Sequence, residues 1–479
     1  MNQKRFLILL CIIACLGFGL RVIDYDRIPP FAETQDEFFY PWSGMTFLQT
    51  GKPVAWSWFP AYKARTIVNY WGAQYPLVSP WVEKPPLYSL ITGIWVLLHN
   101  ERALNQVRLS VVRVIPVFLS LGTIFLTGLL AKRVFSPIVG LVAALIYSTI
   151  PSMVMASRLS LTENLLTPIM ILTLYIFLGE EKSKIWFPVL IGLGCALAIL
   201  TKDIGMALPV VLGIFYILQR NWKGLLIIGI CSSIAIIIHP LMGFYYDWSL
   251  FKNVMLDYRI AHSLSGLPQL VTTLFQFPVV GSKEHLFPDG GMLMGYLLFF
   301  TSPFWLLKNE QTRSFSMVKF NWLPKSFKLP MLDNNWKTEI LIGVPLVYFV
   351  LLSMLASGEG WSYFGWHVYP LFPFLTILMA KIFIDLWQKP NLTWLLTLTL
   401  ILGASTIRFI FISLPREIQH RWQYVYVGLF ASIFLGFVTQ NQRFLRLLLL
   451  GLFICFIGVN IYTVFNLSHL YTSFAQPVH

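Results

Sequence analysis

Charged residues are scarce in this sequence of 479 residues. Asp, Glu, Lys and Arg together make up 12% of the chain, about half the roughly 25% that is usual in soluble globular proteins. At the same time 57% of the residues are hydrophobic, and apolar runs of about 18 residues or more recur from end to end. The sequence therefore excludes soluble, disordered and fibrous proteins and predicts a polytopic membrane protein.

Cysteine is also rare, and its placement argues against a disulfide framework. The five cysteines all lie within apolar runs, where packing between helices is the more usual role: Cys11, Cys15, Cys195, Cys231 and Cys455. A small-residue cleavage motif is missing after the first apolar run, so that run is expected to be a retained span and not a removed signal peptide.

Basic residues outnumber acidic ones, which gives a net charge of +14. In membrane proteins an excess of Lys and Arg collects in short cytoplasmic loops and sets the orientation of the chain. We therefore expect no nucleic-acid partner.

The hydropathy pattern predicts an all-α membrane bundle of about 13 transmembrane helices. Two long hydrophilic stretches, 24–106 and 240–290, and one basic loop, 308–337, separate them. The expected spans are 5–23, 107–131, 137–155, 160–178, 185–201, 204–219, 224–239, 291–307, 338–356, 367–387, 391–412, 423–438 and 444–465.

The apolar segment 85–98 decides the topology. It has too few residues to cross a bilayer, which takes about 20. If it crossed, the basic loops near 132–133, 182–184 and 220–223 would face outward, against the usual bias of Lys and Arg toward the cytoplasm. We therefore interpret it as a juxtamembrane helix of the first outer loop, with the N-terminus cytoplasmic and the tail 466–479 outside.

An acidic pair follows the first span, in a chain with only 21 acidic residues. Asp36 and Glu37 lie in the first outer loop, close to the expected membrane surface. A carboxylate there acts as a general base when an acceptor hydroxyl or amine is held within hydrogen-bond reach. The alternative is a solvated loop acid without a chemical role.

A second element opens the juxtamembrane helix. Lys84 is followed by Pro85 and Pro86, and proline fits the first turn of a helix because its missing N–H has no partner there in any case. Lys84 is thus expected at headgroup depth, where it either binds a lipid phosphate or anchors the chain in the interface.

Three more polar segments fall on the same predicted face. Arg158 and Glu163 stand between the third and fourth spans, Lys202 follows the fifth, and His367 and Tyr369 begin the tenth. Ionisable groups at a membrane boundary are costly, and they are usually paired or functional. Their shared face predicts one site built from distant parts of the chain.

Taken in order, these motifs resemble those of the GT-C glycosyltransferases. The similarity is greatest to bacterial transferases related to protein O-mannosyltransferases and to lipid A aminoarabinose transferases. It covers roughly residues 1–240, which would form the catalytic module, followed by a second outer loop at 241–290 and C-terminal helices at 291–479. The resemblance implies an integral plasma-membrane enzyme, of bacterial type, that takes a sugar from a polyprenyl-phosphate carrier on the extracytoplasmic face.

Residue by residue, the resemblance implies distinct roles. Asp36 resembles the essential catalytic carboxylate, Glu37 its companion and Glu163 a second acid that is usually aspartate in relatives. Lys84 and Lys202 resemble residues that meet the donor phosphate. Attack from the face opposite the phosphate would invert the anomeric carbon.

Other residues of these segments are secondary candidates. Arg158 is a third cation for the phosphate, and Tyr40, Tyr88, His367 and Tyr369 are candidates for substrate binding. The acceptor is expected to be a lipid, a glycan or a protein, and the sugar a hexose or a pentose.

One position departs from the family pattern. Relatives that act on lipid A often read Asp-Glu-x-Arg-Tyr, whereas here Phe39 stands where the arginine would be. This difference argues against assuming an aminoarabinose donor.

A metal is weakly indicated. Glu83 with His262 or His285 is the candidate set for a divalent ion, but these residues show no paired-ligand spacing. A different class of function, a transporter or flippase for lipid-linked sugars, would bind substrate with the same outer charges. Such proteins usually carry inverted repeats and ionisable residues at the bilayer midplane, neither of which the sequence displays.

Overall fold

The structure is a computed structural model of the chain. It describes residues 1–31, 35–70, 72–179, 184, 186–261, 289–307, 317–319, 328–330, 336–354, 365–413 and 421–468.

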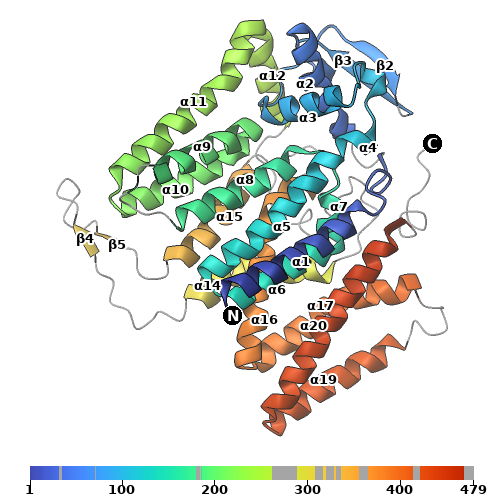
Figure 1. The fold of residues 1–479 in the computed structure, drawn as a ribbon, viewed down its shortest axis with the longest axis vertical. Coiled ribbons are helices and arrows are strands. Elements are labelled where there is room, and N and C mark those ends of the chain that lie inside the picture. Colours follow the sequence, from blue (N-terminus) through green and yellow to red (C-terminus); the bar gives the residue numbers. More distant parts are fainter. Residues whose placement is uncertain are drawn as a thin grey trace.

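Long apolar helices dominate the fold and run roughly alongside one another (Figure 1). The span expected at 137–155 is interrupted after Thr149, and the short helix α7 (Pro151–Ala156) follows. Each predicted span overlaps one of these apolar helices. They are α1 (Gln3–Val22), α5 (Val114–Val134), α6 (Pro137–Thr149), α8 (Thr162–Phe177), α9 (Trp186–Thr201), α10 (Ala207–Leu218), α11 (Trp222–Tyr246), α14 (Gly290–Leu307), α15 (Trp336–Met354), α16 (Phe372–Gln388), α17 (Leu392–Ser413), α19 (Trp422–Val438) and α20 (Gln442–Phe465).

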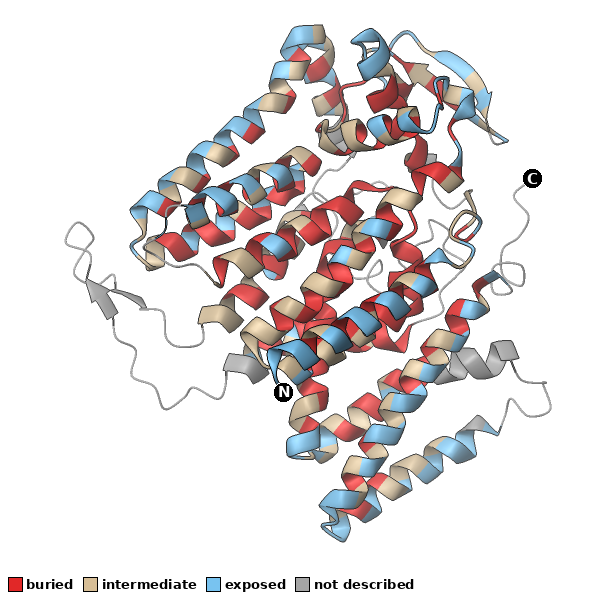
Figure 2. Cartoon of the chain, in the orientation of Figure 1, coloured by how far each residue is buried: buried red, intermediate tan, exposed pale blue. Residues whose placement is uncertain are grey.

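Six helical stretches of the described chain are long and apolar enough to cross a membrane by themselves, and the other apolar helices are shorter. The number of spans thus stays a prediction, whereas the polytopic helical architecture is confirmed. Figure 2 shows the expected distribution of burial, with α6, α8 and α16 mostly buried and α11, α19 and α20 largely exposed.

Small residues let the central helices approach closely. Gly128 of α5 and Gly140 of α6 face each other, since a Cβ added to Gly140 would lie 2.5 Å from the Gly128 carbonyl oxygen. Gly17 of α1 similarly leaves room for Ile124 and Ser148. Small residues at helix contacts are typical of membrane bundles, in which packing replaces the hydrophobic effect as the main source of association.

The first loop folds into a cap over one end of the bundle. It contains α2 (Phe39–Thr50) and α3 (Leu87–Leu98), which pack tightly together. They cross at Gly44 and Gly93, where a Cβ on Gly44 would lie only 1.7 Å from the Ser89 carbonyl oxygen. The expected helix at 85–98 is therefore present, beginning after its two prolines.

A small antiparallel sheet lies beside these helices and was not anticipated. Its strands β1 (Ala55–Trp56), β2 (Thr66–Tyr70) and β3 (Ala73–Val78) pair in the order β1-β3-β2. Gly72, with a φ of +75°, sits in the turn between β2 and β3, where glycine adopts a positive φ without strain.

The second outer stretch differs from expectation at its start. The span predicted to end at 239 continues through Pro240 to Tyr246, and α12 (Trp248–Ala261) follows it directly. The apolar pattern persists past the proline, because Leu241, Phe244 and Tyr245 all point outward from α11. All of 262–288 and most of the basic loop lie outside the described residues.

Candidate functional site

Buried arginines hold the turn that leaves α1. Arg158 donates from Nη1 to the Ile28 carbonyl, 3.0 Å away, and from Nη2 to the Leu20 carbonyl, 2.9 Å away. Leu20 lies in the last turn of α1, whose carbonyls lack partners within the helix. Arg21 does the same for α6, donating to the carbonyls of Tyr147 and Ser148. Arg158, a candidate for phosphate binding, is thus 1% exposed and bonded to backbone.

Glu37 is fully buried against Arg113, a residue that the sequence analysis missed. Arg113 donates from Nη2 to Glu37 Oε2 over 2.6 Å and from Nε to Oε1 over 2.9 Å. Its Nη1 donates to the carbonyls of Tyr25 and Pro29. The sequence did indicate it, because Arg113 lies inside an apolar run at a membrane boundary, where a charged residue is usually paired or functional.

The same carboxylate reaches the start of α8. Glu37 Oε1 accepts the backbone N–H of Ser160 over 2.9 Å. Because Asp36 and Glu37 share the short helical turn η2 (Gln35–Phe38), this bond and the Arg113 pair fix the position of Asp36 relative to α8. Glu37 therefore connects Arg113 and Ser160, and both of its carboxylate oxygens are hydrogen-bonded inside the protein.

Two buried tyrosines brace the segment before α8. Tyr88 of α3 shares a hydrogen bond with the Ser160 hydroxyl at 2.9 Å, and Tyr40 of α2 shares one with Thr162 at 3.4 Å. Their rings meet edge to face with centroids 5.1 Å apart. Burial raises the pKa of both phenols, so they stay protonated. At 4% and 0% exposure, these candidate substrate residues contact protein instead of open space.

Glu163 and Lys202 form an ion pair at the site. Lys202 follows the end of α9 and directs its Nζ onto Glu163 Oε1 in the first turn of α8. Thr162 donates its hydroxyl to the other carboxylate oxygen over 3.0 Å. A carboxylate near a helix N-terminus also gains from the helix dipole. The Glu163 side chain is 1% exposed, while that of Lys202 keeps 13%.

Asp36 lies half-buried within reach of these charges. Its pKa is raised to about 6, chiefly because burial disfavours the carboxylate. The positive charges of Lys84 and Lys202 pull that pKa down, while Glu163 and Glu37 push it up. Segments from the first loop, the start of α8 and the end of α9 thus converge on one carboxyl group.

Glu83 is the member of the candidate metal set that the structure describes. It is 8% exposed, and burial raises its pKa to about 7, with a smaller contribution from Asp36. Its Oε1 has no hydrogen-bond partner among the described residues. Within the described chain, however, no group of three or more His, Cys, Asp or Glu side chains could hold a metal. His262 and His285 lie outside the described residues.

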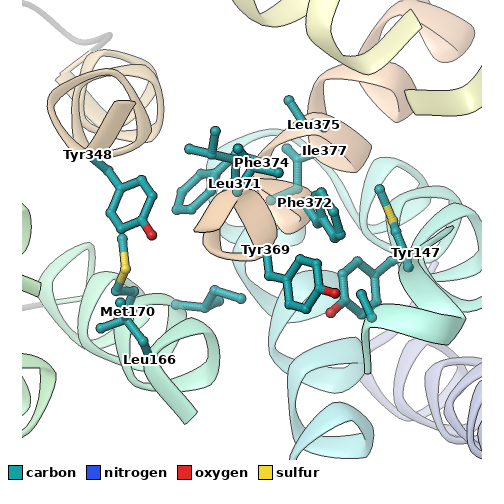
Figure 3. Close-up of a cluster of buried hydrophobic side chains, with 14 of the residues drawn as sticks. Tyr147, Leu166, Met170, Tyr348, Tyr369, Leu371, Phe372, Phe374, Leu375 and Ile377 are labelled. Carbon is teal, nitrogen blue, oxygen red and sulfur yellow. The ribbon is translucent and has the colours of Figure 1, made fainter. Parts of the chain in front are cut away.

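His367 and Tyr369 lie in the short helix η6 (Gly365–Leu371), which packs against α8 and α15. Tyr348 donates its hydroxyl to the His367 carbonyl over 2.7 Å. Tyr369 is 2% exposed and points toward Tyr147, with Phe372 beside it (Figure 3). Both candidates thus belong to a segment that is packed into the helical core.

Comparison with known proteins agrees with this architecture. ArnT from Cupriavidus metallidurans in complex with undecaprenyl phosphate aligns over 97% of this chain and 78% of its own, with 15% identity and a TM-score of 0.52. The chain has the GT-C fold. The apo form of the same protein gives a TM-score of 0.51 with the same identity and coverage.

Other matches are more limited in extent. Residues 83–244 match the family described as dolichyl-phosphate-mannose-protein mannosyltransferase. This GT-C segment begins at Glu83 and includes Lys84, Glu163 and Lys202, whereas Asp36 precedes it. Archaeal oligosaccharyltransferase AglB from Archaeoglobus fulgidus, in complex with an inhibitory peptide and a dolichol-phosphate, aligns over 80% of this chain and 51% of its own, with 11% identity and a TM-score of 0.48. No curated protein matches the chain.

Proposed function

We propose that this chain is an integral-membrane glycosyltransferase that moves a hexose or pentose from a polyprenyl-phosphate carrier to an acceptor outside the cytoplasm. The observation that carries the proposal is the carboxyl group of Asp36, half-buried and under the influence of Lys84, Lys202 and Glu163 together. The family match over 83–244 and the GT-C fold support the same class of reaction.

The chemistry needs a base, positive charge and alignment. The acceptor oxygen or nitrogen attacks the anomeric carbon while the bond from that carbon to the phosphate oxygen breaks. Asp36 takes the proton from the acceptor, and the bonding electrons leave with the phosphate. The departing phosphate needs no proton, so the protein supplies cations and orientation, which account for much of catalysis in such reactions. Attack opposite the phosphate inverts the anomeric carbon.

Lys84 and Lys202 are the cations that we assign to the donor phosphate. Lys84 is half-buried at the start of α3, and Lys202 retains partial exposure beside Glu163. When the donor phosphate binds, the N–H groups of the Lys202 ammonium would be shared between the phosphate and Glu163. Glu163 would then orient the acceptor. Glu37, Arg158, Tyr40 and Tyr88 take positioning roles in this scheme, because each is buried and already hydrogen-bonded to the protein.

The surroundings of Phe39 bear on the sugar. Its ring packs against Tyr40, Trp56 and Trp81, with centroid distances of 4.3, 5.5 and 5.3 Å. The position held by arginine in lipid A transferases is thus filled by an apolar cluster. We propose a donor other than aminoarabinose, transferred to a lipid, glycan or protein.

The orientation follows the distribution of charge. With Lys132, Arg133, Arg220 and Lys223 in the cytoplasm, the N-terminus is cytoplasmic and the site lies outside. We propose a bacterial plasma membrane, because the motifs of the sequence resemble most those of bacterial transferases.

The decisive experiment compares Asp36→Asn with the wild-type protein, purified and supplied with a polyprenyl-phosphate sugar. Asp36→Asn should lose transfer by at least about a hundredfold, since general base catalysis contributes roughly that much or more. Asp24→Asn is the matched control, because Asp24 is an exposed acid of the same loop whose φ of 48° asparagine adopts readily. Donor that is relocated across the membrane but never consumed would instead identify a transporter.

A further inference from the structure

His239 occupies an unexpected position between the two lysine-bearing segments. It lies in α11, at the residue where that span was expected to end, and is 6% exposed. Figure 1 shows the upper end of α11 close to α12, α2 and α3. The function proposed above gives this imidazole no role.

One ring nitrogen holds the segment that carries Lys84. His239 Nε2 lies 3.0 Å from the Val82 carbonyl oxygen. A carbonyl only accepts, so Nε2 must carry the proton and donate it. On the other side of the residue, the Val82 N–H donates to the Tyr62 hydroxyl over 3.1 Å. Both backbone groups of Val82 are therefore held by buried side chains, two residues before Lys84.

The other ring nitrogen faces the segment that carries Lys202. Nδ1 lies 4.0 Å from Oδ1 of Asp203, the residue after Lys202. The ring itself packs edge-on against Phe251 of α12, with centroids 5.2 Å apart. Asp257 of the same helix accepts the N–H of Ala61 over 2.6 Å, so α12 is tied to the first loop as well.

We infer that His239 is a positioning residue that sets the separation of Lys84 and Lys202, and so shapes the pocket for the donor phosphate. The sequences around the two lysines lie more than a hundred positions apart, and this imidazole lies between them, bonded to Val82 near Lys84 and 4.0 Å from Asp203 beside Lys202. A phosphate requires its cations at fixed spacing, and displacement by about 1 Å at such a site can cost on the order of a hundredfold in rate. The inference rests on the proposed function, since it assigns the two lysines to the donor.

The test uses substitutions matched to the geometry. His239→Phe keeps a ring against Phe251 but donates nothing to Val82, whereas His239→Gln places an amide N–H at the depth of Nε2. We expect His239→Phe to raise KM for the polyprenyl-phosphate sugar about three- to tenfold, the equivalent of one lost hydrogen bond. KM for the acceptor should stay unchanged, and His239→Gln should restore donor KM to within about twofold.

Comparison of donor KM with kcat distinguishes a positioning role from a general loss of folded protein. Loss of folded protein lowers the apparent kcat through the active fraction and leaves KM unaltered. His99→Gln is the control, because His99 also bonds a carbonyl through its ring, that of Trp95, but lies exposed at the end of α3. If His239→Phe does not fold, His239→Asn makes the same test, since its shorter amide stops short of Val82.

The outcomes distinguish the two hypotheses. Unchanged donor KM in His239→Phe, with Asp36→Asn inactive, would overturn the role of His239 and leave the proposed function standing. If the wild-type protein transfers no sugar, the proposed function fails, and equilibrium binding of undecaprenyl phosphate then provides the readout. Three- to tenfold weaker binding by His239→Phe at unchanged thermal stability would support the positioning role, and equal binding would overturn it.

Discussion

Lys202, just past the end of α9, forms an ion pair with Glu163 in the first turn of α8. The pair lies at the end of these two antiparallel helices that is far from the loop joining them, and the acid is almost fully buried. The pair links a candidate phosphate ligand to a candidate acid, so its disruption should affect both stability and donor use.

Lys202→Ala should destabilise the protein by about 3–5 kcal/mol, because it leaves the buried carboxylate of Glu163 without its cation. Thermal unfolding in detergent, followed by tryptophan fluorescence, measures the change. The double variant Lys202→Ala/Glu163→Gln should recover most of the loss, since the uncompensated charge is gone. An unfolding midpoint of Lys202→Ala equal to that of the wild type would show that the pair contributes nothing.

The transfer rate should depend on pH through Asp36. Its pKa is raised to about 6, mainly by burial, and the base must be deprotonated to accept a proton. Activity at low donor concentration should therefore rise as pH increases through 6 and level off above about 7. Rates measured between pH 4.5 and 8, with residual Asp36→Asn activity as the baseline, test this. A rise in rate centred near pH 4 would show that burial does not raise the pKa of Asp36.

Arg113→Lys should be strongly destabilising even though it preserves the charge. The guanidinium uses three nitrogens to bind Glu37 and two carbonyls, and an ammonium cannot reproduce that planar fork. We expect a loss of about 1–3 kcal/mol, because acceptors that the guanidinium bonded are left buried without a donor. The matched control is Arg108→Lys, whose partner Glu101 lies 2.7 Å away but whose own side chain is 62% exposed. That change should cost less than about 1 kcal/mol, and equal effects of the two substitutions would refute the argument.

Gly44→Ala should separate α2 from α3. The added methyl group would lie 1.7 Å from the Ser89 carbonyl oxygen, and backbone cannot yield as a flexible side chain does. The Lys84 segment precedes α3 directly, so we expect lower thermal stability together with weaker donor binding. Gly19→Ala is the control, because a Cβ there would meet nothing within 4 Å. Normal stability of Gly44→Ala would show that the two helices have room to shift.

Helix positions were predictable because the bilayer imposes a local rule. Each spanning segment must satisfy its own backbone hydrogen bonds and be apolar along about 20 residues, which can be recognised one segment at a time. One exception is α11, whose end was placed before Pro240. Proline removes only one N–H, and a helix with apolar residues on both sides can continue through it.

The site was predictable in part. Asp36, Lys84, Glu163 and Lys202 were expected to converge, and the structure brings their charges within mutual influence. The partner of Glu37 was not foreseen, since Arg113 lies 76 positions away and no spacing rule connects them. The buried carbonyl contacts of Arg158 were equally invisible, because a backbone acceptor leaves no mark in the sequence.

Composition and hydropathy alone determined that this protein is a helical membrane bundle with its polar chemistry gathered in a few short segments, since solvation by lipid acts on each residue separately. Only the tertiary structure decided which charges face a ligand and which hold the scaffold. Glu37 and Asp36 are neighbours of the same chemical type, yet one is enclosed by Arg113 and the other lies half-buried beside two lysines. That division depends on how distant helices pack, because a charge in a low-dielectric interior is stabilised only by the partners that packing brings to it.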